Sequence, residues 1–305
     1  MLRQKKVIHM ISAQKLVKVV PTLTRASARF GKYKREFSQP VRTPDAKQNK
    51  VIAQLKQAWT NFQPFRRGFS GGGLDPSLTY ETVIGLIQRI SYSAKDVENF
   101  SILLAECQEE TGFAFKAGLF LSALISNGKE KDYVVYTHHL SESIQYLGSR
   151  NTKNVNINGD VGYSCAWEMK SGTLIVNGNV GDAAANSIES GNMLIRGDAG
   201  DHVGCYMQGG TVTVEGNAFR YAGADMQGGL LVIKGNADYE TGAGMYGGRL
   251  EVFGNAGELV GYTAKGSEIH IQGDYESVYI EGTGSCGVKI YYKGVLIVKD
   301  GREIE

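Results

Sequence analysis

The sequence predicts an α+β protein whose larger part is a right-handed, single-stranded parallel β-helix of about seven coils. Three observations predict it: a glycine that recurs at a fixed period, apolar columns in register with that glycine, and a repeat that contains no helical stretch. The right hand follows by analogy with parallel crossover connections. We expect a basic arm or linker over residues 1–70, a small helical cap over 74–150 and the β-helix over 151–305.

Composition excludes several classes of protein and shows an uneven charge. Glycine, at 40 of 305 residues, is too rare for collagen, four cysteines do not make a disulfide scaffold, and no apolar run reaches the roughly 18 residues that span a bilayer. The formal net charge is only +2. Residues 1–70, however, carry 16 basic and two acidic side chains, so the rest of the chain has a net charge of −12.

The repeat is marked by a glycine followed by Asn or Asp. It occurs seven times with a constant period of 19, at Gly159, Gly178, Gly197, Gly216, Gly235, Gly254 and Gly273. Seven occurrences without a slip are the strongest pattern in the chain, and a period of this size is typical of a solenoid.

The columns around this glycine show which side chains are buried. The positions two and four residues before it are apolar in every repeat, as in Val212 and Val214, and the residues between them are mixed or polar. This alternation predicts one short strand per repeat with one buried face. Ten residues after the glycine a methionine column, Met169, Met207, Met226 and Met245, is interpreted as core rather than as a redox or copper site.

A short strand with one buried face is not stable alone, so the repeats must stack, each strand pairing with its equivalent one turn later at about 4.8 Å. Two ladders agree with stacking. No two Asp residues are adjacent in the column after the glycine, and Arg196, Glu215 and Lys234 alternate in sign. The pattern fades at Tyr292, and a last strand over Val295 to Lys299 is interpreted as part of a terminal cap.

Part of the repeat resembles a known family. The segment Gly197-Asp198-Ala199-Gly200, followed by Gly204 and by Met207-Gln208-Gly209-Gly210, returns in part at Gly254-Asn255-Ala256-Gly257 and Gly261. It is similar to the GXGXG repeat, which forms the C-terminal β-helix of the large subunit of glutamate synthase and most of one subunit of formylmethanofuran dehydrogenase. The likeness covers about residues 151–301.

The resemblance implies a right-handed parallel β-helix that serves as a structural spacer or assembly subunit. In that family, flavin, iron–sulfur, molybdenum or tungsten and glutaminase chemistry lie elsewhere. Residues 1–150 do not resemble an amidotransferase or a flavin barrel. Catalytic roles are therefore not carried over to this chain.

The first 37 residues contain no acidic side chain before Glu36. This composition fits an organellar transit peptide, a basic arm that binds nucleic acid, anionic lipid or an acidic protein surface, or a solvated tail. The three alternatives stay open. We expect an intracellular and cytoplasmic protein, or an organellar one if residues 1–37 are a transit peptide.

The helical cap is predicted from start and stop signals. Gly71-Gly72-Gly73 is interpreted as a hinge. Asp75-Pro76 begins a helix that runs to about Tyr92, and Ser93 with Asp96 begins a second that ends near Gly112. The remaining predicted elements are a helix over Phe113 to Ser126, a strand over Asp132 to Thr137 and a short helix over Leu140 to Leu147.

No catalytic, cofactor-binding or metal site is predicted. His138-His139 is interpreted as structural, because adjacent residues seldom chelate one metal. Cys107, Cys165, Cys205 and Cys286 form no CxxC pair and are interpreted as reduced thiols. Asp182 and Asp201 share a column but are interpreted as a solvated ladder partly neutralised by Arg220 rather than as a catalytic pair.

The outward columns suggest an interaction face. Five apolar residues are expected to point away from the core: Ile175, Leu194, Leu230, Val232 and Phe253. They would be covered by the helices or by a protein partner, which includes a second copy of the chain. The leading hypothesis is a non-catalytic scaffold. The alternatives are an accessory subunit of an oxidoreductase complex in nitrogen or one-carbon metabolism, and a module that tethers to anionic lipid or nucleic acid through residues 1–70.

Overall fold

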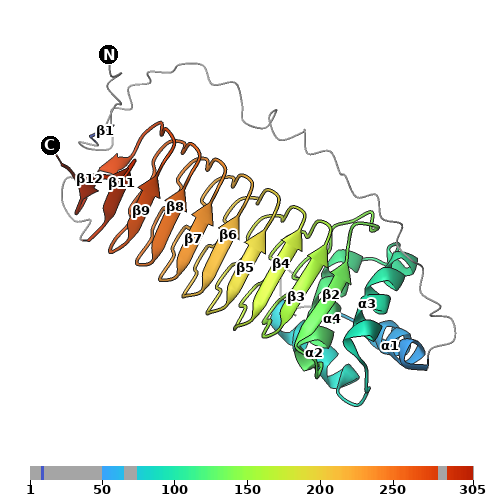
Figure 1. Cartoon of the computed structure of the whole chain (residues 1–305). Helices are drawn as coiled ribbons and strands as arrows, with labels where there is room; N and C mark the ends of the chain where they lie inside the picture. The colour runs from blue at the N-terminus through green and yellow to red at the C-terminus, as the bar shows by residue number, and fades with distance from the viewer. Residues whose placement is uncertain (1–7, 10–49, 65–73, 281–286, 305) are drawn as a thin grey trace.

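The computed structural model describes residues 8–9, 50–64, 74–280 and 287–304 of the chain. Parallel strands stack along one axis, and the helices lie at one end of the stack (Figure 1). The stack consists of β2 (Asp132–Tyr136), β3 (Asn154–Asn158), β4 (Thr173–Asn177), β5 (Asn192–Ile195), β6 (Thr211–Val214), β7 (Leu230–Ile233), β8 (Arg249–Val252), β9 (Glu268–Ile271) and β11 (Lys289–Tyr292). The predicted parallel β-helix is confirmed, with about eight turns.

The register and the burial follow the repeat. From β3 to β9 each residue pairs with its equivalent in the next repeat, for example Leu231 with Leu250. Within β7, Leu231 and Ile233 are fully buried while Leu230 and Val232 are half-buried. The side chains predicted from the sequence to be buried are therefore the ones that face the core in the strand. Met169, Met207, Met226 and Met245 are fully buried, as predicted for a core column.

The Asn and Asp side chains after the repeat glycine bond each turn to the backbone of the next turn. The Asp198 carboxylate accepts the backbone N–H of Asn217 in the next turn at 2.7 Å, and Asn217 Oδ1 accepts that of Asn236 at 2.9 Å. Bonds between the side chains themselves are secondary, as at Asn217 Nδ2 and Asp198 Oδ1, 3.1 Å apart. Either Asp or Asn can occupy a position in this column, because the bond to the next turn requires only an acceptor oxygen.

Replacing Asp198 by alanine is expected to destabilise the protein by about 1–3 kcal/mol, because the part-buried N–H of Asn217 loses its acceptor. Asp198→Asn keeps the acceptor and is expected to change the free energy of unfolding by less than about 0.5 kcal/mol. Urea denaturation followed by circular dichroism measures both. Equal losses for the two variants would mean that charge, rather than the acceptor, matters at this column.

The first turn of the β-helix begins at β2, earlier than the expected start at residue 151. Asp132 pairs with Asn154, an offset of 22 positions. The short helix predicted for Leu140 to Leu147 is wrong. Its backbone instead bonds the next turn, where Gly162 N–H donates to the Ile144 carbonyl at 2.8 Å and Tyr146 N–H to that of Tyr163 at 2.8 Å.

Two of the helices begin at the predicted caps. The Asp75 side chain accepts the N–H of Leu78 before α2 (Pro76–Ile87), which ends earlier than the expected Tyr92. Ser93 and Asp96 form the predicted capping box before α3 (Ala94–Leu103), which a 3-10 helix (Leu104–Cys107) continues.

The third predicted helix, α4 (Phe113–Asn127), seals the open end of the first turn. Every side chain of α4 from Phe113 to Ile125 is buried, as expected of a helix covered on all sides. Gln145 N–H of the first turn donates to the Ala114 carbonyl of α4 at 2.9 Å. The helical cap therefore covers apolar side chains that the end of the coil would otherwise expose.

A further helix, α1 (Lys50–Asn61), lies inside the range expected to be a basic arm or linker. Its Trp59 packs edge-on against Phe120 of α4, with ring centroids 5.4 Å apart, and donates to Glu110 Oε1 at 2.8 Å. Lys116 of α4 donates to the other oxygen of Glu110 at 2.8 Å and lies over the Trp59 ring. Residues 50–64 are thus part of the cap.

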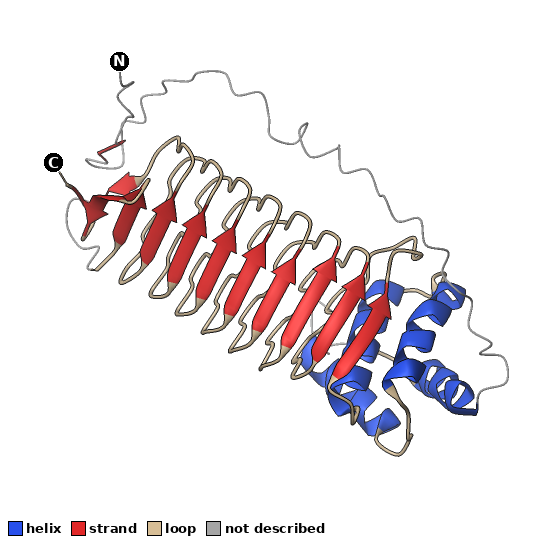
Figure 2. Ribbon diagram, viewed as in Figure 1, coloured by secondary structure: helices blue, strands red, loops and turns tan. Residues whose placement is uncertain are grey.

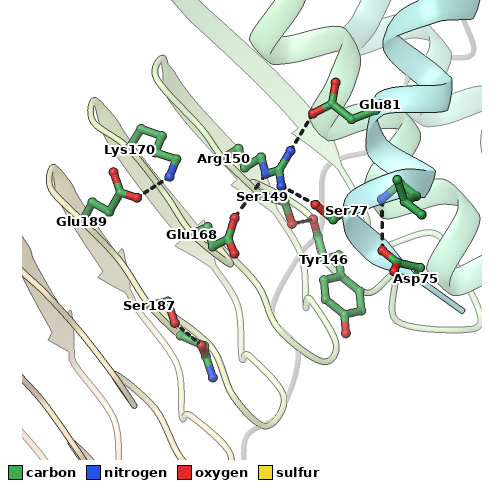
Figure 3. A network of polar contacts seen from close by, with 12 residues as sticks. Asp75, Ser77, Glu81, Tyr146, Ser149, Arg150, Glu168, Lys170, Ser187 and Glu189 are labelled. Atoms are coloured by element: carbon green, nitrogen blue, oxygen red, sulfur yellow. Dashed lines mark hydrogen bonds and ion pairs between the residues drawn. The ribbon is translucent and has the colours of Figure 1, made fainter. Parts of the chain in front are cut away.

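One arginine joins the cap to the β-helix. Arg150, in the loop before β3, lies between α2 and the second turn (Figure 3). Its guanidinium contacts Glu81 and Ser77 of α2 at 2.7 and 2.5 Å and Glu168 at 3.2 Å. Because Glu81 belongs to the helical cap and Glu168 to the β-helix, their contacts with the Arg150 side chain hold α2 against the β-helix.

The other end of the stack closes with antiparallel strands. β11 is followed by β12 (Val295–Lys299), which pairs with it antiparallel, and by the edge strand β13 (Arg302–Glu303). The predicted last strand is confirmed, and reversal of direction ends the parallel coil (Figure 2). At this end, β1 (Ile8–His9) pairs in parallel with β10 (Tyr279–Ile280).

Candidate interaction surfaces

The seven repeat glycines lie where neighbouring turns approach one another closely. A Cβ built on Gly216 would lie 2.6 Å from the Gly197 carbonyl oxygen of the preceding turn, and one on Gly178 would lie 2.5 Å from that of Gly159. Both distances are far below van der Waals contact. The close approach of the turns therefore explains why this column is glycine.

The outer face of the sheet carries the apolar residues predicted to be an interaction face. Ile175 pairs with Leu194, Leu194 with Thr213, and Thr213 with Val232, so the four side chains form one column over four consecutive turns. We call this column, Ile175, Leu194, Thr213 and Val232, the outer strip. All four residues are half-buried.

The other two predicted residues flank the outer strip. Leu230 lies on the same face of β7 and pairs with Thr211. Phe253 follows β8 and is 51% exposed. On its column the alternating charges pair as expected, with Glu215 between Arg196 at 3.5 Å and Lys234 at 3.1 Å. The outer strip therefore has a column of paired charges along one side and Leu230 with Thr211 on the other.

The helices do not cover the outer strip. They lie at the β2 end of the stack, where α3 packs against β2 (Figures 1 and 2). Among the described residues, no helix lies over the middle strands β5 to β7. The described helices are therefore not what half-buries the outer strip over these strands.

Sequence reasoning missed a second surface, a groove of about 620 Å³. It is formed by the loop that follows the glycine in each of several successive turns. Its floor consists of small residues on successive turns, Cys205, Ala224 and Ala243, all buried. We call this surface the loop groove. The recurring small residue eight positions after the glycine was the signal that could have identified it.

Aromatic rings line the loop groove. The His202 and Tyr221 rings stack with centroids 4.7 Å apart and an angle of 20° between their planes. Tyr163 and Tyr206 are each 47% exposed, and Tyr262 lies toward the other end. The groove thus presents flat, polarizable faces to solvent.

Carboxylates lie among these rings. Asp182, Asp201, Asp225 and Glu240 all line the groove, whereas no Lys or Arg of the described residues does. The Asp225 charge raises the pKa of the Tyr206 hydroxyl. The hydrogen bond from Tyr239 to Glu240 raises the pKa of the Tyr239 hydroxyl to about 12. Both shifts are those of phenols beside negative charge.

Asp182 and Asp201 behave as the predicted ladder. Asp182 Oδ1 accepts the backbone N–H of Asp201 at 2.9 Å, and Asp201 Oδ1 accepts that of Arg220 at 3.1 Å. The Arg220 guanidinium also contacts Asp201 Oδ2 at 2.6 Å. Arg220 neutralises Asp201 in part, as expected from the column.

The thiols and the histidine pair have structural surroundings. Burial raises the pKa of the Cys165 thiol and raises that of Cys205 to about 12, so both stay protonated near neutral pH. A ring nitrogen of His138 lies 3.2 Å from the Asn158 carbonyl, and one of His139 lies 3.1 Å from that of Ile102. Cys286 lies outside the described residues.

The described residues contain no group of three His, Cys, Asp or Glu side chains that could hold a metal ion. In the same part of the chain no helix is long and apolar enough to cross a membrane. The predictions for residues 1–37 concern a segment of which only Ile8 and His9 are described.

Comparison with known proteins adds no family name. A scan of the sequence against protein-family models found no match. A search of curated proteins found no match either. The similarity to the GXGXG-repeat family therefore remains a resemblance of residues and spacing.

Proposed function

We propose that this chain is a non-catalytic β-helix scaffold that docks a protein partner on its outer strip. The observation that carries the proposal is the strip itself. Ile175, Leu194 and Val232 lie in one column on paired strands, and the helices leave that column uncovered. A sheet paired through its whole length offers a partner a rigid surface, which keeps the entropy lost on binding small.

The polar side chains of the β-helix support a structural role. Asp182 and Asp201 accept backbone N–H groups of the next turn, and Glu215 pairs with two cations. Cys165 is fully buried and its thiol pKa is raised. Groups of these types are the ones that acid–base or nucleophilic chemistry would use. Here the carboxylates bond neighbouring turns to one another, and the Cys165 thiol is packed in the core.

The experiment is to isolate the tagged chain from the cells that produce it and to identify the proteins that co-purify by mass spectrometry. The scaffold proposal expects a stoichiometric partner, or a stable homo-oligomer when the protein is purified alone. A monomer without a partner under both conditions would contradict it.

The alternative is an accessory subunit of an oxidoreductase complex, which is supported by the resemblance of residues 151–301 to the GXGXG repeat. Absorbance spectra and metal analysis of the protein purified alone distinguish a subunit without a cofactor from an enzyme with its own cofactor. A bound flavin or iron–sulfur chromophore would overturn the scaffold proposal. Oxidoreductase subunits among the co-purifying proteins would favour the accessory role.

A further inference from the structure

We propose that the loop groove binds an extended, arginine- or lysine-rich segment of a partner protein. This site lies in the loops after the repeat glycine, not on the sheet face. The inference therefore goes beyond the proposed docking on the outer strip and is tested independently of it. It rests on the shape, the charge and the aromatic lining of the groove.

The shape of the groove suits a linear ligand. Its lining runs from Tyr163 to Thr263, which lie in turns five steps apart along the stack, or roughly 24 Å at the spacing of paired strands. Because Cys205, Ala224 and Ala243 have small side chains, they leave the groove open across the middle turns. About seven residues of an extended chain would fill this length.

The negative charge of the groove favours a cationic ligand. Four carboxylates line it, and no Lys or Arg of the described residues does. Arg220 is paired with Asp201, which leaves the charges of Asp182, Asp225 and Glu240 without a cationic partner in the lining. A neutral ligand would desolvate these carboxylates without compensation, and an anionic one would be repelled, whereas guanidinium or ammonium groups would pair with them.

The aromatic lining favours the same ligand. Guanidinium and ammonium groups are attracted to the faces of aromatic rings, and Arg also stacks on them. Tyr206 is half exposed and lies beside Asp225, so one cationic side chain can contact a ring and a carboxylate together. A docked segment would therefore be held by alternating ring and charge contacts along the turns.

The test uses a fluorescein-labelled peptide of four Arg-Ser repeats and the full-length protein, with binding followed by fluorescence anisotropy. The groove variant combines Asp182→Asn with Asp225→Asn. Asparagine at position 182 keeps the oxygen that accepts the Asp201 N–H, so this bond between turns is retained. The matched control combines Asp160→Asn with Asp198→Asn, which makes the same charge change in a ladder where Asn already occurs at other turns.

The groove variant is expected to weaken peptide binding by about tenfold or more, and the control by less than about twofold. Thermal unfolding followed by circular dichroism checks that both variants fold. No binding by the wild-type protein, or equal weakening by both variants, would overturn the proposal. Displacement of the peptide by cellohexaose would also overturn it, because it would assign the groove to a neutral glycan. None of these outcomes bears on a partner bound at the outer strip.

Discussion

Replacing Gly216 by alanine is expected to destabilise the β-helix by about 3 kcal/mol or more, among the largest effects of any single methyl group in this chain. The added Cβ would lie 2.6 Å from the Gly197 carbonyl oxygen and closer still to Asp198 Oδ1. The nearest backbone belongs to the turn before, which is paired on both sides and has little freedom to move away. The free energy of unfolding from urea denaturation measures the loss.

Gly85→Ala is the matched control for this substitution. Gly85 lies inside α2, and a Cβ there has no atom within 4 Å. Alanine is expected to stabilise the helix by about 0.5–1 kcal/mol, because glycine loses more backbone entropy in a helix. If Gly216→Ala proved as harmless as Gly85→Ala, the close approach of the turns at the glycine column would be contradicted.

The second large effect on stability is expected at Leu231 in β7, and its neighbour Leu230 serves as the control. Leu231 is fully buried, and Leu231→Ala is expected to cost about 2–5 kcal/mol through lost burial and a cavity. Leu230 points to the outer face and is half-buried, so Leu230→Ala is expected to cost less than about 1 kcal/mol. The same denaturation measurement compares the two.

The comparison tests the register of the strand as well as burial. A slip of one residue would exchange the inner and outer faces, because side chains alternate along a strand. A larger loss at Leu230 than at Leu231 would mean that β7 presents the opposite face to the core.

Sequence periodicity predicted the middle of the molecule because every turn there repeats the same contacts. The Gly216 N–H donates to the Gly197 carbonyl one repeat earlier at 3.1 Å, and the Asp198 carboxylate accepts the N–H of Asn217 one repeat later at 2.7 Å. A local rule that recurs seven times is readable from one sequence. The capping box of Ser93 and Asp96 was readable for a different reason, since both of its partners lie within one helical turn.

The parts that were missed depend on contacts without a repeated signature. The first turn has an offset of 22 positions and no Gly-Asx pair, so local propensity favours a helix over Leu140 to Leu147, although their backbone bonds the next turn. In α1, Ile52, Leu55 and Trp59 have the spacing of a helix with one buried face. The basic composition of residues 1–70 indicates an arm or linker instead, so this helix was not predicted. The loop groove combines side chains from six turns, none of which marks a site by itself.

Binding of the co-purified partner to a single outer-strip variant is the most direct test of the scaffold account. Leu194→Arg places a charge in the middle of the strip, and Asn156→Arg places the same charge on the outer face of β3, in the same column but at a polar, exposed position. The account predicts that Leu194→Arg weakens binding by about tenfold or more while Asn156→Arg changes it by less than about twofold. Undiminished binding by a folded Leu194→Arg protein would contradict docking on this face.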